Sequence, residues 1–565
     1  MKSEFKHFPV RPAKLTAGFA QRQYGKLLAD LAAAEAAAEP AKWMTLYQQW
    51  NALKAYVSGE GARIGHAFNR DLSDKRLQAA ERYFRQKIIP AITPAEHRLV
   101  KAFLASRHRG ALERRFGQLL GSVYQTQLKP LDPANSALNV QVGELTTAYD
   151  QLIAAAQVKV GGQTMTLWKA RSLGISEDPG LRQAAYLARG DWFLAHHRRL
   201  SKTFDKLVGL RAQMAHNVGY SSFTPLAYEI MGRTDYGPPE VAAFRGYIRR
   251  HLVPLWERLA LDSARRLGDQ KLKAWDLMYA PGLSLPLGIV PVESQLDGAE
   301  AMFERLLPRL NRHFKRMRRE GLIDLESRPH KRSGAYCTEF ADEGRVAILL
   351  NSTGDAEDIS TLTHEMGHAF MGWESQRIEA VDLQWPTADL CEVHSMGLEF
   401  LCLPLVDQFF SAEHTARFTR HRWREAVYTL CYICVVDEFQ HWIYAHPDAT
   451  PTERDAQWCR LFDIYLPGVD YSGVEKYQKT RWYAQAHIFD QPFYYIDYAL
   501  AEVGALQLAG LDRLDHARAL EAYLSLCRIG GTMSLLQAFR HAGLGSPFDE
   551  KVITGLSAQA EQLLL

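Results

Sequence analysis

Apolar residues recur at helical spacing along most of the chain, and polar residues fill the positions between them. From residue 14 to about residue 125 this pattern predicts successive amphipathic helices. One helix, rich in Ala and Glu, is expected to close at Pro40. Another, "SDKRLQAAERYFRQKIIP", is expected to begin at a capping residue and end at Pro90. Helical patterns continue beyond this region, so we expect a mainly α-helical protein.

β-Structure is predicted at two places. The stretch "VKVGGQTMTL" (158–167) alternates around a Gly-Gly pair and predicts a β-hairpin. The run Val346 to Leu350 predicts a short strand that leads into the helix described next. If the edge of this strand is open, an extended peptide can pair with its backbone, which makes Ala347 and Ile348 candidate substrate-binding residues. A strand buried in a small sheet is the plainer interpretation, and it is compatible with such pairing.

The length of the chain indicates more than one lobe. With 565 residues it exceeds the size at which single cores stop growing, about 250 to 300 residues. No linker rich in Pro, Gly or Ser separates the lobes. We therefore place a soft boundary near residue 180, between an N-terminal helical lobe (1–180) and a catalytic region (181–565).

Charge and composition limit the partners. Lys and Arg total 67, and Asp and Glu total 64, which leaves a formal charge of +3 and favours neither a nucleic-acid partner nor a membrane surface. The N-terminal segment is polar and interrupted by Pro9 and Pro12, and no run of about 18 apolar residues follows it. An odd number of cysteines, 7, suits free thiols. These features predict a soluble cytoplasmic protein, without predicting its oligomeric state.

Candidate chemistry lies in "STLTHEMGHAF" (360–370), which contains an HExxH motif. A helix turns about 100° per residue, so His364 and His368 lie about 40° apart on one face and can bind one metal ion. Glu365 is rotated about 100° from His364, outside the ligand set but within reach of a water. This is the position of a general base. By itself the motif is loose, and a chance match is the alternative.

The residues around the HExxH motif exclude some classes of metal site. The long metzincin signature is excluded, because this chain has Met371 and Glu374 where that signature requires Gly and His. A structural zinc site is disfavoured, since such sites are typically closed and rich in Cys. A catalytic zinc ion needs a third protein ligand and an open position.

Candidates for the third ligand lie on a second predicted helix, which starts after Pro386. Asp389, Glu392 and Glu399 lie along one side of this largely apolar helix. Acidic residues are costly to bury without a partner, so they indicate a nearby cation. Spacing leaves the choice among the three open. His394 is rotated about 200° from Glu392 and is interpreted as a packing residue.

Three segments together resemble a known family. "HEMGHAF" (364–370), "EVHSMGLEF" (392–400) and "HIFDQPFYYIDYALAEV" (487–503) are similar to the oligoendopeptidase F branch of the thimet oligopeptidase family, including the Pz-peptidase type. Further matching segments stand in the family's order: "MGRTDYG" (231–237), "WDL" (275–277), "KRSGAYC" (331–337) and "DEFQHWIY" (437–444). The resemblance implies a two-lobed helical zincin-type metallopeptidase, with one Zn²⁺ per chain in a deep central channel and a small β-sheet beside the active-site helix.

The resemblance also assigns residues. It implies Glu392 as the third zinc ligand and Glu399 as a carboxylate behind the ligands. Relatives often have Gly-Gly-Tyr in a loop where this chain has Gly334, Ala335 and Tyr336. We expect these three residues to contact the substrate.

The segment near the C-terminus supplies hydrogen-bond donors. Pro492 is expected to start a helix on which Tyr495 and Tyr498 are neighbours. A tyrosine cluster is usually core, but the resemblance implies that His487, Tyr495 and Tyr498 donate to the substrate carbonyl and the oxyanion. Tyr494 is expected to point elsewhere on the helix and to be structural.

The predicted function is that of a zinc-dependent oligoendopeptidase, in which Glu365 is the general base and short peptides are the substrates. The alternative is a catalytically inactive peptide-binding protein that keeps the channel. Such a protein would be expected to lack the base or a ligand, and all of them are present here.

Overall fold

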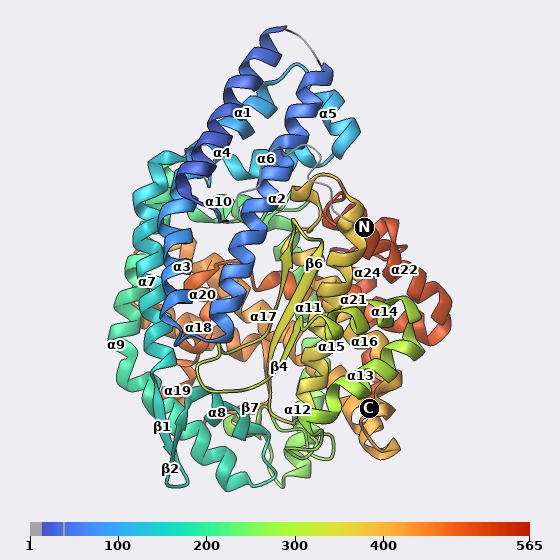
Figure 1. Ribbon diagram of the computed structural model, residues 1–565. Helices are drawn as coiled ribbons and strands as arrows, with labels where there is room; N and C mark the ends of the chain where they lie inside the picture. Colours follow the sequence, from blue (N-terminus) through green and yellow to red (C-terminus); the bar gives the residue numbers. More distant parts are fainter. Residues whose placement is uncertain (1–13, 38–39, 131) are drawn as a thin grey trace. The chain divides into compact units, whose positions relative to one another are not determined.

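The computed structural model describes residues 14–37, 40–130 and 132–565 (Figure 1). These residues are mostly helical with three small sheets, which confirms the predicted mainly α class. The polar segment around Pro9 and Pro12 lies outside the described residues. Within the described part of the chain, every helix is too short or too polar to cross a membrane.

The chain forms two compact units, each assembled from separate stretches of sequence. The first comprises residues 1–131, 290–409 and 511–543, and the second comprises residues 132–289, 410–510 and 544–565. The predicted lobe boundary near residue 180 falls inside the second unit and stays a prediction.

The first unit contains the following helices: α1 (Ala17–Ala37), α2 (Pro40–Arg70), α3 (Lys75–Tyr83), η1 (Phe84–Ile88), α4 (Ile89–Ala105), α5 (Arg109–Phe116), α6 (Leu120–Leu128), α13 (Val292–Leu306), α14 (Pro308–Arg319), α15 (Glu357–Glu374), α16 (Ala388–Cys402), α22 (His516–Ile529) and α23 (Leu535–His541). The stop predicted at Pro90 is wrong. The chain passes through the π-helical stretch η1 into α4, where Pro90 lies in the first turn and needs no N–H partner.

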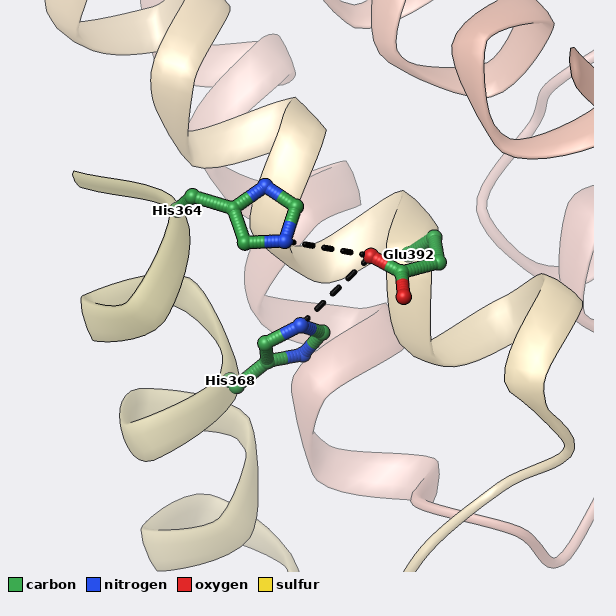
Figure 2. A group of neighbouring side chains, drawn as sticks. All are labelled: His364, His368 and Glu392. Carbon is green, nitrogen blue, oxygen red and sulfur yellow. Dashed lines mark ion pairs between the residues drawn. The ribbon is translucent and has the colours of Figure 1, made fainter. Parts of the chain in front are cut away.

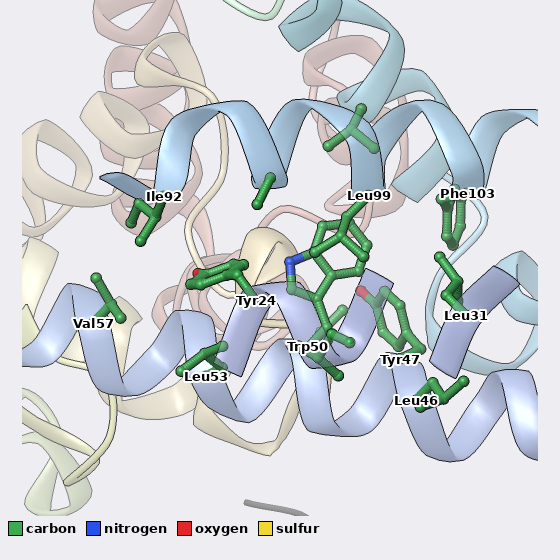
Figure 3. Close-up of a cluster of buried hydrophobic side chains, with 14 of the residues drawn as sticks. Tyr24, Leu31, Leu46, Tyr47, Trp50, Leu53, Val57, Ile92, Leu99 and Phe103 are labelled. Carbon is green, nitrogen blue, oxygen red and sulfur yellow. The ribbon is translucent and has the colours of Figure 1, made fainter. Parts of the chain in front are cut away.

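A core of buried apolar and aromatic side chains joins α1, α2 and α4 (Figure 3). Within it the ring of Trp50 stacks on that of Tyr124, with centroids 5.4 Å apart. The ammonium group of Lys54 lies 4.2 Å from the Trp50 ring and pairs with Asp382, which belongs to the segment between α15 and α16. The N-terminal helices are therefore attached to the connection between the two helices that carry the candidate ligands.

A three-stranded sheet lies beside α15 in the order β4 (Ile323–Glu326), β6 (Arg345–Ser352), β5 (Tyr336–Phe340). Strand β6 pairs in parallel with β4 and antiparallel with β5, so Ile348 has a partner on each side. Ala347 and Ile348 are both 0% exposed. The strand predicted before the HExxH helix is present, but the condition for peptide pairing, an open edge, is not met. Because β6 is central, Ala347 and Ile348 are corrected as substrate-binding candidates: they cannot offer their backbone to a peptide.

The second unit contains these elements: α7 (Ser136–Ala154), β1 (Gln157–Val160), β2 (Gln163–Thr166), α8 (Leu167–Ser172), α9 (Pro179–Asn217), α10 (Phe223–Ile230), α11 (Pro238–His251), α12 (Val253–Arg266), β3 (Leu272–Lys273), α17 (Ala412–Ala445), α18 (Pro451–Tyr465), β7 (Val469–Asp470), α19 (Glu475–Gln478), α20 (Ala486–Asp490), most of α21 (Ile496–Leu514) and α24 (Glu550–Leu564). Strands β1 and β2 pair antiparallel, which confirms the predicted hairpin. Gly161 and Gly162 supply its turn with φ of 57° and 82°.

Candidate active site

Two helices cross closely at Gly367, which lies on α15 between the two histidines of the HExxH motif. A Cβ atom placed on Gly367 would lie 2.6 Å from the carbonyl oxygen of His394 and 2.6 Å from Cα of Ser395, both on α16. No side chain larger than hydrogen fits between these backbones. The crossing brings the histidine face of α15 against the acidic side of α16.

Three side chains meet at this crossing (Figure 2). The Nε2 atoms of His364 and His368 lie 3.2 Å and 3.5 Å from Oε2 of Glu392. Two ligand atoms on a tetrahedral zinc ion, with bonds of about 2.0 to 2.1 Å, stand about 3.3 Å apart. The donor separations and the donor set of two imidazoles and one carboxylate therefore fit a catalytic zinc ion.

The other two acidic residues of α16 differ in their contacts. Nδ1 of His364 donates to Oε1 of Glu399 over 2.8 Å, which leaves the lone pair of Nε2 facing Glu392. Asp389 is outside the group of three; its Oδ1 accepts hydrogen bonds from the backbone N–H of Leu390 and the hydroxyl of Thr387 at the start of α16.

Electrostatics favour a cation at this place. Burial favours a neutral His364, but its hydrogen bonds and charge interactions with Glu392 and Glu399 raise its pKa well above the usual value. Burial alone would raise the pKa of Glu392, but the two histidines lower it well below its usual value. The two carboxylates thus hold a positive charge at the imidazoles, which a divalent ion can supply in place of a proton.

Glu365 has the environment expected of a base. The residue is 5% exposed, and its Oε2 has no hydrogen-bond partner among the described residues. Burial raises the pKa of Glu365, and the positive charges of the neighbouring histidines partly offset this. A buried carboxylate oxygen without a protein partner can accept a hydrogen bond from a water.

Ser395 also belongs to this site, although the sequence motifs did not indicate it. The hydroxyl of Ser395 donates to Oε2 of Glu392 over 2.9 Å, and so orients the carboxylate that faces both imidazoles. Ser395 stands three residues after Glu392, one helical turn along the same face. That spacing was the available signal.

The loop before β5 is held in place by its neighbours. Nδ2 of Asn351 donates to the carbonyl oxygen of Gly334 over 2.7 Å, and Gly334 has a φ of 87° that suits glycine. The hydroxyl of Tyr336 accepts a hydrogen bond of 3.0 Å from Asn69 of α2. Ala335 is partly buried between them.

The C-terminal motif lies in the second unit and departs from the predicted helix. Helix α20 ends at Asp490 and α21 begins at Ile496, so no helix starts at Pro492. Phe493 has a φ of 68°, in the left-handed region that a phenylalanine rarely adopts. This bend interrupts the helix, and Tyr495 lies in the turn before α21.

The bend gathers a cluster of four rings. The ring of His487 stacks on that of Tyr495 with centroids 4.9 Å apart and lies 6.2 Å from that of Tyr498. Tyr494 was expected to point elsewhere, which is wrong: its hydroxyl donates to that of Tyr498 over 3.0 Å. The helical wheel that separated Tyr494 from the other tyrosines does not apply, because Phe493 redirects the chain.

Gln485, a second residue that the sequence motifs did not indicate, orients His487. Tyr432 donates to Oε1 of Gln485 over 3.2 Å, so the amide nitrogen of Gln485 faces Nδ1 of His487 at 2.7 Å. An amide nitrogen only donates, so Nδ1 accepts and the proton of neutral His487 lies on Nε2. Burial raises the pKa of Tyr495 well above its usual value, so its hydroxyl stays protonated. Both side chains are thereby donors.

Sequence and structure comparisons point to one family. The profile of "Peptidase family M3" matches residues 172–557, and that of "Peptidase M3 N-terminal domain" matches residues 14–131. An oligoendopeptidase F homolog from Lactococcus lactis subsp. lactis is 27% identical over 203 residues. That match covers 35% of this chain and 32% of the relative, so it spans about a third of the relative's length.

Similarity to solved structures extends over nearly the whole chain. A protein described as oligoendopeptidase F has 30% identity and a TM-score of 0.91, covering 99% of this chain and 98% of that chain. Pz peptidase A, solved with an inhibitor, has 30% identity and a TM-score of 0.89, covering 99% of both chains.

Proposed function

Because the chain belongs to the oligoendopeptidase F branch of peptidase family M3, we propose that it is a zinc-dependent oligoendopeptidase that hydrolyses internal bonds of short peptides. This membership confirms the resemblance indicated by the sequence motifs. The observation that carries the proposal is the meeting of His364, His368 and Glu392 beside a buried Glu365. The proposed location is the cytoplasm, and no nucleic-acid or membrane partner is proposed.

One Zn²⁺ per chain is proposed, with His364, His368 and Glu392 as its ligands. When bound, zinc supplies a Lewis acid that polarises the peptide carbonyl and makes a nearby water more acidic. Glu399 holds Nδ1 of His364, and Ser395 holds the carboxylate of Glu392, so both ligands are oriented before the metal binds.

Glu365 is the proposed general base. Its Oε2 accepts the proton of the attacking water and then passes it to the departing amine, so no acyl-enzyme forms. Burial raises the pKa of Glu365 above its usual value, which makes it a stronger base than an exposed carboxylate.

His487, Tyr495 and Tyr498 are the proposed hydrogen-bond donors to the substrate carbonyl and the oxyanion. This assignment is supported by the family resemblance of the segment 487–503 and by the donor state of His487 and Tyr495. Neutral donors suit this role, because they stabilise developing negative charge without releasing a proton.

Peptide substrates are proposed to bind along β5 rather than β6. Strand β5 lies at the edge of the sheet. Burial, and to a smaller extent the charge of Glu365, raises the pKa of Cys337 on this strand, which indicates that β5 lies close to the proposed base. Gly334, Ala335 and Tyr336 lead into β5 and are the proposed substrate contacts. Backbone pairing holds a peptide largely independently of its side chains.

The test is digestion of a mixed pool of short peptides by zinc-loaded protein, with products sequenced by mass spectrometry. We expect internal cleavage, and Glu365→Gln should bind zinc as wild type does while losing nearly all turnover. Glu392→Ala should lose zinc affinity in a metal titration. Peptide binding without cleavage by the zinc-loaded wild type would support the inactive peptide-binding alternative instead.

A further inference from the structure

Two motifs of the family pattern have no role in the proposed mechanism. The segments 231–237 and 437–444 lie far from the HExxH motif in sequence, and they contribute neither a ligand nor a base. Each contains a buried side chain that contacts the backbone of one residue in the C-terminal turn, Phe493.

Gln440 of α17 contacts the nitrogen of that residue. Its Oε1 accepts the backbone N–H of Phe493 over 2.9 Å, and its Nε2 donates to the carbonyl oxygen of Val436, one turn earlier on α17, over 3.3 Å. The residue is 1% exposed. A buried amide with both ends engaged has little freedom to rotate.

Arg233 contacts the carbonyl side of the same residue. Its Nη2 donates to the carbonyl oxygen of Phe493 over 2.5 Å and to Oδ1 of Asp497 over 2.6 Å. The Arg233 and Asp497 side chains are each 1% exposed. The rings of Tyr228 and Tyr236 lie 4.3 Å and 5.5 Å from its guanidinium carbon. An ion pair this deeply buried must be well satisfied to be tolerated.

The residue held in this way is the one with unfavourable backbone geometry. At a φ of 68°, Phe493 needs surrounding contacts to keep it in the left-handed region. Tyr494 and Tyr495 follow it directly, and Asp497 precedes Tyr498. A change in the backbone angles of Phe493 would therefore redirect the three tyrosine rings together.

We propose that Arg233 and Gln440 are positioning residues that clamp the left-handed turn at Phe493 and thereby aim Tyr495 and Tyr498 at the substrate. This inference rests on the proposed donor role of the two tyrosines. It gives the two motifs a function without placing either residue in contact with the substrate.

The first experiment compares variants of Gln440. Gln440→Met removes the acceptor at similar length and should lower kcat by about 10- to 100-fold, the cost of a misplacement near 1 Å, with zinc content unchanged and KM changed much less. Gln440→Glu keeps an acceptor oxygen and should recover most of kcat. Gln507→Met is the matched control. Oε1 of Gln507 accepts the backbone N–H of Gly545 over 2.7 Å, and its Nε2 donates to the carbonyl oxygen of Val503, one turn earlier on α21, over 3.2 Å. Its loss should leave kcat unchanged.

A double-mutant cycle tests the route of the effect. If Gln440 acts through the tyrosines, its effect should be small once the Tyr498 hydroxyl is gone. In a Tyr498→Phe background, adding Gln440→Met should therefore reduce kcat by less than about threefold. Two results would overturn this inference without affecting the proposed function. One is full additivity of the two substitutions; the other is a wild-type kcat for Gln440→Met when Tyr498→Phe is impaired. The paired variant Arg233→Gln/Asp497→Asn removes both buried charges and should resemble Gln440→Met.

Amide hydrogen exchange tests the proposed clamp independently of catalytic activity. The segment 491–498 should exchange at least about tenfold faster in Gln440→Met and at the wild-type rate in Gln507→Met. If Tyr498→Phe has a wild-type kcat, the proposed role of the tyrosines is wrong. Unchanged exchange in Gln440→Met would show that the clamp itself is wrong.

Discussion

Replacing Gly367 by Ala tests whether the helix crossing sets the metal site. The added Cβ would lie 2.6 Å from two backbone atoms of α16, whereas ordinary contacts begin at 3.4 Å. The helices must then separate by at least 0.8 Å (3.4 − 2.6), because backbone atoms cannot rotate out of the way. Glu392 lies on α16 two residues before His394, so it moves away from the imidazoles by a similar distance.

This displacement is large for a metal site and modest for stability. Metal–ligand distances tolerate only about ±0.2 Å, so we expect zinc to bind about 10- to 100-fold more weakly. Overpacking costs about 1 to 3 kcal/mol, while Ala in place of Gly within a helix returns about 1 kcal/mol. The net loss of stability is therefore about 0 to 2 kcal/mol, and zinc affinity is the sharper measurement.

The assay is competition for zinc against a chromophoric chelator, together with urea unfolding of the metal-free protein. Gly209→Ala in α9 is the control, since nothing lies within 4 Å of a Cβ placed there. It should leave zinc affinity unchanged and stabilise the protein by up to about 1 kcal/mol. A zinc dissociation constant for Gly367→Ala within about twofold of wild type would refute the reasoning.

Three further predictions concern single side chains. Glu399→Ala should weaken zinc binding by about 10- to 100-fold and Asp389→Ala should change it little, as measured by the same chelator competition; equal losses would contradict the distinction. Tyr498→Phe should lower kcat by about 10²- to 10³-fold with a smaller effect on KM, and Tyr494→Phe, which removes a donor to Tyr498, should lower kcat less; steady-state kinetics in which only KM changes would contradict a role in the transition state. Burial raises the pKa of Glu339 from 4.5 to about 7, so the folded state keeps a proton that the unfolded state releases, and stability falls as pH rises through this interval. Glu339→Gln should therefore gain about 2 kcal/mol relative to wild type between pH 5 and pH 8 in urea unfolding of the metal-free proteins, and a constant difference would contradict the buried titration.

Local patterns could be predicted because their causes are local. Helical periodicity along residues 14–125, the Gly-Gly hairpin and the i, i+4 spacing of His364 and His368 all depend on backbone geometry within a few residues. The structure contains the helices and the hairpin, and it places both histidines on one helix. Spacing left three carboxylates open as the third ligand, and the family resemblance singled out Glu392 among them.

Errors in the sequence-based predictions occurred where distant segments determine local structure. Strand β6 is central because β4 and β5 pair with its two sides, and the order of strands in a sheet is not written into any one strand. Tyr494 joins the ring cluster because Phe493 is left-handed, held by Gln440 and Arg233, which lie 53 and 260 residues away.

By itself, the sequence determined the helical class, the histidine pair on one helical face and the family, since each depends on residue order alone. Only the tertiary structure decided how closely α15 and α16 approach at Gly367, that Ser395 orients Glu392, and which tyrosines share one cluster. The physical reason is that these features are distances between segments. They are set by packing and by buried hydrogen bonds across long sequence separations, which periodicity along the chain does not encode.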